Sequence, residues 1–303
     1  MHKVLMAAAA GVMLLVSGCA TSKESAAAIG PPQPALWVVR DADSTLYLYG
    51  TIHLRKPGAR WGGPAAETAL NEAQEVWTEL EIDASKEAAM QGLVVQYGID
   101  REHPLSTKID PARAPQLQAA ATKLGLPPNG FDAMKPWLAS LTLTVVPMVQ
   151  AGYDPNAGVD RAVDRIARAG GKTMRWFETN EEQIRFLSGV SEPLQLQMLY
   201  EALDEINEGP AALAAMEAAW ERGDDRALAT EMVAEMARDY PELYEALLKK
   251  RNAAWTEVLT RELAGAGVDF VAVGAAHLAG PDSVQAMLRA RGLAVERVTP
   301  APY

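Results

Sequence analysis

The sequence has a single cysteine, Cys19, among its 303 residues. A disulfide within the chain is therefore impossible. Aromatic residues are also scarce, at 6%, and alanine fills many polar-patterned stretches, which favours a helix-rich mixture over an all-β architecture. With 49% hydrophobic and 22% charged residues, the composition predicts a globular α/β or α+β protein with a large core.

Basic residues are outnumbered, which leaves a formal net charge of -11 and a pI near 5.0. No stripe of lysine and arginine interleaved with aromatic residues is present, so the sequence lacks the electrostatic footprint of a nucleic-acid surface. The acidic residues gather after Asn180, where they are expected to form solvated helix faces. Nucleic acid is therefore excluded as a partner.

The main apolar run near the start, residues 4–16, follows His2 and Lys3 and is too short to span a bilayer comfortably. A short basic start, an apolar run and small residues are typical of a secretory signal, predicted here over residues 1–18. Residues 19–34 are mostly small residues and proline, which predicts a flexible tether.

The end of this signal, residues 16–19 (VSGC), resembles the lipobox of bacterial lipoproteins. That resemblance implies that Cys19 is lipidated; the alternative is ordinary signal cleavage. Ala20 follows where an aspartate would indicate inner-membrane retention. The expectation is a periplasm-facing protein of the cell envelope, lipid-anchored in the outer rather than the inner membrane.

A G-x-x-H-L pattern occurs twice. Residues 45–49 (TLYLY) lead into Gly50 and His53, and residues 270–273 (FVAV) lead into Gly274 and His277. Each reads as a strand that ends in a turn. Because ligands collect beyond the carboxyl ends of parallel strands, we predict two parallel neighbours whose histidines converge.

The segments between these motifs alternate between strand and helix patterns. Residues 36–40 and 45–49 predict a hairpin, residues 65–75 a helix, and residues 76–83 (VWTELEID) a strand. Glu79, Glu81 and Asp83 share one face of that strand. Glu79 is the preferred site residue because a helix between parallel strands returns the chain to the same sheet edge. For Glu81 and Asp83 a wet edge strand is the alternative.

Helices are predicted over residues 86–97, 111–124, 134–150 and 158–169, with Pro147 expected to kink or end the third. Residues 172–177 form a further strand candidate that leads to Glu178, which either joins the site or serves the N-terminus of the next helix. Residues 181–264 show only helix patterns. Arg251 and Asn252 lie in the last of these, where Arg251 shares a face with Trp255, as a structural stack or as a site cation.

The motifs in this order resemble the TraB/GumN family, related to the Tiki proteins and more remotely to the erythromycin-esterase and ChaN-like fold. The matching segments are GTIHL (50–54), Glu79, KPW (135–137), GVDRA (158–162), FET (177–179) with Gln183, RNAAW (251–255) and GAAHLAG (274–280). Phe177 departs from the aliphatic residue that the family more often has there. The resemblance covers residues 36–298.

The resemblance implies a mixed central sheet built from the N- and C-terminal parts of the chain and flanked by helices. It also implies that both histidines and Glu79 lie in one cleft. We expect one domain over residues 35–303, with a helical insertion at about 181–264. Tiki relatives are described as metal-dependent proteases.

His53, Glu79 and His277 form a two-nitrogen, one-carboxylate set that suits zinc, manganese or cobalt. The leading prediction is metal-assisted hydrolysis of a peptide or small acyl substrate, with Glu178 or Glu81 moving protons.

Arg251 and Asn252 are predicted to steady the oxyanion or orient that carboxylate. One alternative is a metal-free, esterase-like hydrolase with a histidine base oriented by Glu79. Another is an envelope lipoprotein that binds a haem or a peptide without turning it over.

Overall fold

The predicted hairpin forms two neighbouring strands of a six-stranded sheet. Strand β1 (Leu36–Arg40) pairs antiparallel with β2 (Ser44–Thr51), and the side chain of Asp41 accepts hydrogen bonds from the N–H groups of Asp43 and Ser44 at the turn. Strand β2 pairs in parallel with β5 (Gly267–Gly274). The prediction that the two histidine-bearing strands are parallel neighbours is therefore confirmed.

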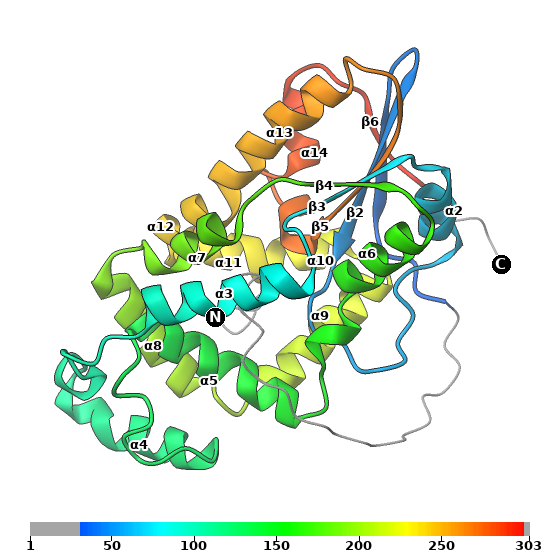
Figure 1. The fold of residues 1–303 in the computed structure, drawn as a ribbon. Helices are drawn as coiled ribbons and strands as arrows, with labels where there is room; N and C mark the ends of the chain where they lie inside the picture. Colours follow the sequence, from blue (N-terminus) through cyan, green and yellow to red (C-terminus); the bar gives the residue numbers. More distant parts are fainter. Residues whose placement is uncertain (1–30, 300–303) are drawn as a thin grey trace. The chain divides into compact units, whose positions relative to one another are not determined.

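Three short strands complete the sheet: β3 (Glu75–Thr78), β4 (Thr173–Trp176) and β6 (Val295–Arg297). The strand order is β4-β3-β5-β2-β1-β6, with β4, β3, β5 and β2 mutually parallel and β1 antiparallel to both neighbours. The sheet is thus mixed and draws on both ends of the chain (Figure 1). With the helices around it, this confirms the predicted α/β class.

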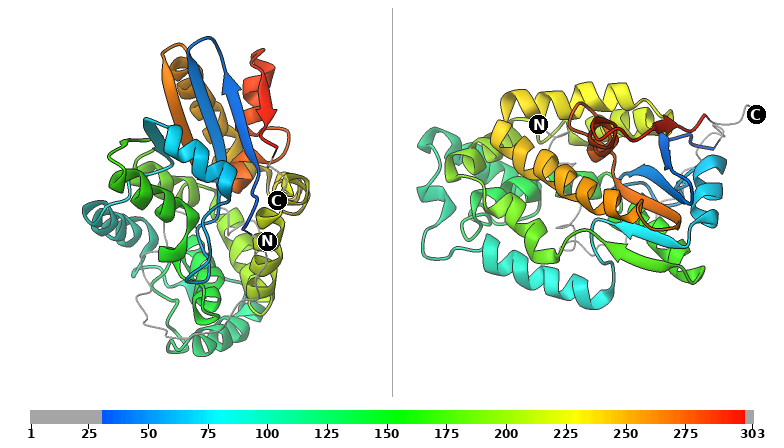
Figure 2. Two further views of the ribbon diagram at one scale, coloured as in Figure 1. Left: turned by 90° about the vertical axis from the view of Figure 1, so that its right-hand side faces the viewer. Right: turned by 90° about the horizontal axis from the view of Figure 1, so that it is seen from above.

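Each face of the sheet is covered by helices. Helices α13 (Lys250–Glu262) and α14 (Val284–Ala290) bury Trp255, Leu259 and Leu288 against the sheet residues Leu48 and Val273. Helix α2 (Pro64–Glu72) lies over the opposite face (Figure 2). Helix α6 (Val159–Ala169) packs against β3, β4 and β5. This sandwich fixes the carboxyl ends of β2, β3 and β5 in one place.

The computed structural model describes residues 31–299, and their contacts divide them into two compact units. Unit 2 holds the sheet and comprises residues 31–82, Gly152–Thr179 and 215–299. Its other elements are the short helix η5 (Pro155–Ala157), α10 (Asp225–Leu228), the π-helix η6 (Ala229–Val233), α11 (Ala234–Asp239), α12 (Pro241–Tyr244), the π-helix η7 (Glu245–Lys249) and the 3-10 helix η8 (Ala275–Leu278).

Unit 1 comprises Asp83–Ala151 and Asn180–Ala214. Its elements are α3 (Ala84–Gly98), η3 (Leu105–Thr107), η4 (Pro111–Arg113), α4 (Ala114–Lys123), α5 (Pro136–Gln150), α7 (Asn180–Ser188), α8 (Glu192–Asp204) and the first part of α9 (Gly209–Glu221). The apolar helix α5 is buried against α8, where Ser140 Oγ donates to the carbonyl of Met198 at 3.0 Å.

The predicted strand over residues 76–83 was too long, because β3 ends at Thr78. There the Thr78 hydroxyl donates to the carbonyl of Leu80 at 2.8 Å. Asp83 instead caps α3 by accepting from the N–H groups of Ser85 and Lys86. Glu81 and Asp83 therefore do not share a strand face with Glu79.

Two other predictions need comment. Pro147 neither ends nor interrupts α5, which runs on to Gln150, so its missing N–H costs the helix only one bond in its last turn. The division into units also does not follow the predicted insertion at 181–264, since Asn180–Ala214 belongs to unit 1 and the remainder to unit 2. The predicted signal, Cys19 and the tether up to residue 30 lie outside the described residues. Within residues 31–299, no helix is long and apolar enough to cross a membrane.

Candidate functional site

The two histidines and Glu79 meet at the end of β5, around Gly274. A Cβ atom placed on Gly274 would lie 3.1 Å from Glu79 Oε1, 3.2 Å from His53 Nε2 and 3.6 Å from His277 Cδ2. Because residue 274 has no side chain, these three residues approach the backbone of β5 this closely, and the point where they meet is here called the Gly274 hollow. The structure thus brings together residues that are far apart in sequence, as the G-x-x-H repeat predicts.

A buried ion cluster adjoins this hollow. Arg251 donates from Nε to Glu178 Oε1 at 2.7 Å, and from Nη2 to Glu178 Oε2 at 2.9 Å and to Glu79 Oε2 at 2.6 Å. Trp255 Nε1 also donates to Glu178 Oε1, and its ring lies 4.8 Å below the Arg251 guanidinium. Arg251 therefore stacks on Trp255 and also places its positive charge between two carboxylates, so the two roles predicted for it do not exclude each other.

Burial and charge set the ionisation of these carboxylates. Burial raises the pKa of Glu79, but Arg251 and the two histidines outweigh it and hold the pKa at about 2. Burial also raises the pKa of Glu178, and there Arg251 only partly offsets the effect. Glu79 is therefore a fixed negative charge, whereas Glu178 is the easier of the two to protonate.

His277 is locked as a neutral imidazole. Its Nδ1 lies 2.6 Å from Asn252 Oδ1, and its Nε2 lies 3.1 Å from Arg251 Nη1. Because a guanidinium only donates, Nε2 must accept and Nδ1 must carry the proton. Burial, together with the charge of Arg251, lowers the pKa of His277 to about 3.

His53 has the opposite surroundings. Its Nδ1 lies 3.3 Å from Asp160 Oδ1, yet neither ring nitrogen makes a well-formed hydrogen bond to any residue in 31–299. Burial lowers the pKa of His53, but Asp160 and Glu79 reverse this and raise it above its usual value. His53 is therefore the group at the hollow that is able to take up a proton.

Asp160 was not among the predicted site residues, although it lies in the GVDRA segment. The segment is tied to the His53 turn, because Val159 N–H donates to the carbonyl of Ile52 at 2.8 Å. A Cβ on Gly158 would lie only 2.6 Å from the His53 carbonyl oxygen, so the chains meet this closely because residue 158 is glycine. A glycine two residues before an aspartate, at the start of a helix, was the available signal.

Thr51 is a second residue that the sequence did not single out. Its hydroxyl is buried and has no hydrogen-bond partner in the described part of the chain. Thr51 pairs with Gly274 in the parallel register, so both residues face the same side of the sheet. Most of the buried side-chain polar atoms without a partner in residues 31–299 thus belong to Thr51, His53 and Asp160.

In this arrangement two members of the predicted metal set, His277 and Glu79, are hydrogen-bonded to Arg251. The lone pair of His277 Nε2 accepts from Arg251, and Glu79 accepts from Arg251 and, at 2.7 Å, from Gly274 N–H. A divalent cation there would also face the guanidinium charge. Within residues 31–299, no group of three or more histidine, cysteine, aspartate or glutamate residues is arranged to hold a metal ion.

The remaining predicted residues are placed as follows. All five N–H groups of Arg251 have acceptors, and three of the five bonds go to the carboxylates of Glu79 and Glu178. Asn252 bridges His277 to the carbonyl of Asp282. Glu81 is half-buried beyond the end of β3.

Comparisons with known proteins agree with these motifs. The model of the TraB/PrgY/gumN family matches residues 35–297. A protein of Treponema pallidum (strain Nichols), described as uncharacterized, is 22% identical over 271 residues, which cover 85% of this chain and 80% of that protein. No solved structure matches the chain.

Proposed function

The chain belongs to the TraB/PrgY/gumN family, and from the geometry of its site we propose that it is a hydrolase that cleaves a peptide or similar acyl bond with water activated by His53. One observation carries this proposal. Buried polar atoms without partners are costly unless a ligand or water satisfies them. One of them, His53 Nε2, lies beside Gly274, while Asp160 Oδ1 lies at the other ring nitrogen of His53 and Thr51 pairs with Gly274 in the sheet. We infer that a water molecule bound to His53 Nε2 and a polar substrate group satisfy these atoms.

In the proposed mechanism Asp160 holds the proton on His53 Nδ1, which leaves the Nε2 lone pair free at the hollow. A water molecule gives its proton to Nε2 while its oxygen attacks the scissile carbonyl carbon. Asp160 and Glu79 stabilise the resulting imidazolium. When the tetrahedral intermediate collapses and the carbonyl carbon separates from its leaving group, His53 returns the proton to that group.

Thr51 and Arg251 have separate electrostatic roles in this scheme. The Thr51 hydroxyl is the free donor on the same face as the hollow, and it hydrogen-bonds the developing oxyanion. Arg251 has no N–H left for the substrate, so it acts by keeping Glu79 ionised and His277 neutral. His277 thereby remains a fixed part of the site.

The metal-dependent form of the same hydrolysis is the second candidate. What favours it is the pair of atoms at the hollow, His53 Nε2 and Glu79 Oε1. It requires His277 Nε2 to leave Arg251. Metal analysis of protein purified without chelator, with cleavage measured before and after chelation, separates the two forms. Activity that is lost with chelator and restored by zinc, manganese or cobalt would overturn the metal-free form.

The principal test is a peptide-library cleavage assay on the wild type and on single variants. We expect His53→Ala to reduce kcat/KM by about 100-fold or more and Asp160→Asn by about 10-fold or more. His103→Ala is the matched control, because His103 is an exposed histidine paired with Asp100 outside the site. Wild-type turnover by His53→Ala would overturn the proposal.

The pH profile gives a second readout. His53 acts as a base, so kcat/KM should rise with pH through the pKa of His53, which lies above 6.5. Asp160→Asn should move this limb to lower pH, because Asp160 is the main charge that raises the pKa. If Asp160→Asn leaves the pH profile unchanged, the assigned pairing of Asp160 with His53 is wrong.

A further inference from the structure

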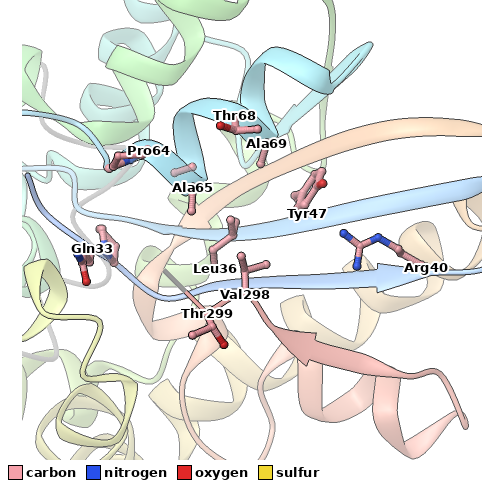
Figure 3. A pocket seen from close by; sticks show the side chains of 13 residues that line it. Gln33, Leu36, Arg40, Tyr47, Pro64, Ala65, Thr68, Ala69, Val298 and Thr299 are labelled. Carbon is pink, nitrogen blue, oxygen red and sulfur yellow. The ribbon is translucent and has the colours of Figure 1, made fainter. Parts of the chain in front are cut away.

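A second concave site lies on the opposite side of unit 2 from α13, between α2 and the outer strands. It is a groove of about 500 Å³, a volume within the usual range for small-molecule sites. Strand β1 and the segment after β6 form its floor, and α2 forms its upper wall (Figure 3). None of the residues discussed at the Gly274 hollow lines this groove.

The groove exists because α2 carries small side chains where it faces β1. Ala65, Ala66 and Ala69 line the upper wall, and Leu36 and Val298 line the floor. In Figure 3 the Ala65 methyl group and the Leu36 side chain point toward each other across the gap. The interior is therefore aliphatic, without a charged group along most of its length.

One end of the groove is different. Arg40 lies there, with its guanidinium carbon 5.9 Å from the centre of the Tyr47 ring and turned back toward the groove in Figure 3. Arg40 is exposed and forms no ion pair with any residue between 31 and 299. The Tyr47 hydroxyl donates to Glu72 at 2.9 Å, so Arg40 stacks on a ring that is itself bonded to a carboxylate, but Arg40 forms no ion pair of its own with that carboxylate. In a chain with a net charge of -11, an exposed guanidinium without an ion pair beside an aliphatic channel can bind an anion.

The floor argues against a peptide as the occupant. Strand β1 is hydrogen-bonded to β2 on one side and to β6 on the other. Val298 N–H donates to the carbonyl of Leu36 and extends that pairing. Strand β1 in the floor is thus paired on both sides, and a peptide backbone lying over it would leave its own polar groups unpaired.

We propose that this groove binds a single-chain anionic amphiphile, with its carboxylate at Arg40 and its acyl chain between α2 and β1. The guanidinium fork matches a carboxylate. An acyl chain has no polar groups to satisfy, and it would cover the partly exposed side chains of Ala65 and Val298 and contact the buried Leu36 and Ala69 beneath them. The groove is independent of the proposed hydrolysis, because it shares no residue with the Gly274 hollow.

The test is a binding assay on the full chain with 11-(dansylamino)undecanoic acid as the fluorescent probe. Laurate, dodecanol and dodecyltrimethylammonium compete below their micellar concentrations. We expect laurate to displace the probe at about 10-fold lower concentration than dodecanol, because only laurate forms a charge-assisted hydrogen bond. Dodecyltrimethylammonium should be the weakest competitor. Equal competition by all three would overturn the assignment of the head group.

Two variants locate the ligand. Arg40→Gln should weaken laurate about 10-fold while leaving dodecanol unchanged, and Arg60→Gln, an exposed arginine of the same region paired with Glu67, is the matched control. Ala65→Trp should fill the groove and abolish binding of all ligands. If both Arg40→Gln and Ala65→Trp, checked for folding by thermal melting, bind laurate as the wild type does, the proposal is wrong.

A chain-length series provides a measurement that needs no variant. The dissociation constant should fall by up to about fourfold for each methylene added between octanoate and laurate, because each is buried against aliphatic walls. A dissociation constant independent of chain length would show that only the carboxylate is bound, and would overturn the proposed channel.

Discussion

His53 and His277 occupy equivalent positions in two copies of one motif, yet their surroundings differ in kind. His277 has a partner at each nitrogen, a guanidinium and an amide, so its protonation is suppressed. His53 has a carboxylate beside one nitrogen and a hollow beside the other. In the proposed mechanism protons are therefore exchanged at His53, whereas His277 is held between Arg251 and Asn252.

The depressed pKa of His277 predicts a pH-dependent stability. Between pH 6.5 and about 3, His277 is protonated in the unfolded chain but neutral in the folded chain. The free energy of unfolding therefore falls as the pH is lowered through this window. At pH 5 the loss from this group should be about 2 kcal/mol relative to pH 7.5. Urea midpoints at the two pH values measure it.

His277→Gln should be less stable than the wild type at pH 7.5 but should lose less stability on going to pH 5. The control is His103→Gln, which replaces an exposed histidine outside the site and should keep the wild-type pH dependence. If His277→Gln retains the full wild-type slope between pH 7.5 and 5, another group is responsible.

Gly274 makes the hollow, so adding one methyl group should close it. In Gly274→Ala the new Cβ would lie 3.1 Å from Glu79 Oε1 and 3.2 Å from His53 Nε2. We expect about a 100-fold loss of kcat/KM, with a stability cost of about 1 kcal/mol because only small shifts are needed. Cleavage assays and thermal melts together test this.

The control for this change is Gly92→Ala in the middle of α3, where an added Cβ meets nothing within 4 Å. Alanine is the better helix former, so this variant should gain about 0.5–1 kcal/mol and keep full activity. Wild-type turnover by Gly274→Ala would mean that the hollow is not where the water reacts.

At the scale of elements, the sequence predicted most where a strand pattern was unambiguous. Residues 45–49 and 270–273 are apolar runs closed by glycine, and β2 and β5 are parallel neighbours as expected. Strand β3 was overextended because the apolar residues of VWTELEID continue past the point where Thr78 bonds to the Leu80 carbonyl. A side-chain hydrogen bond of this kind cannot be predicted from the spacing of apolar residues.

The site residues were likewise predictable only where they follow a clear strand pattern. Histidines and carboxylates at strand ends were predictable because a parallel sheet collects them at one edge. Asp160 and Thr51 were not, since their importance depends on which neighbour lies opposite: the His53 turn for Asp160 and Gly274 for Thr51. Such pairings are fixed by tertiary contacts, which one sequence does not contain.

Asp269, near the start of β5, gives a prediction at this scale. Burial, reinforced by Glu75 and Glu262, raises the pKa of Asp269 to about 6. An acid whose folded pKa is raised destabilises the fold above that pKa and ceases to do so below its unfolded value. Asp269→Asn should therefore raise stability at pH 7, by about 1 kcal/mol after allowance for solvent screening of a half-buried group.

Thermal melts at pH 7 and pH 4 test this prediction. The gain should be present at pH 7 and absent at pH 4, where the folded wild type already carries a protonated Asp269. Asp132→Asn, in unit 1, is the matched substitution and should show no such gain at pH 7. Equal gains for Asp269→Asn at both pH values would exclude charge repulsion as the cause.

At the scale of the molecule, the chain passes between the two units four times, near residues 82, 151, 179 and 214. Each unit is therefore built from separate segments, and helix α9 is shared between them. Helix patterns in residues 181–264 look alike on both sides of residue 214, so the sequence offered no signal for the boundary. All the residues assigned to the proposed reaction belong to unit 2.

The predicted location of the protein in the cell depends on Cys19, which lies outside the described residues. We expect Cys19 to be acylated, because it is the sole thiol and follows a signal that ends in VSGC. Cys19→Ala should abolish incorporation of an alkynyl fatty acid and move the protein from the membrane fraction to the soluble fraction. Ser22→Ala, three residues downstream, should do neither. Because acyl chains supply the membrane affinity, a Cys19→Ala protein that stays in the membrane fraction would contradict the lipid anchor and with it the predicted outer-membrane location.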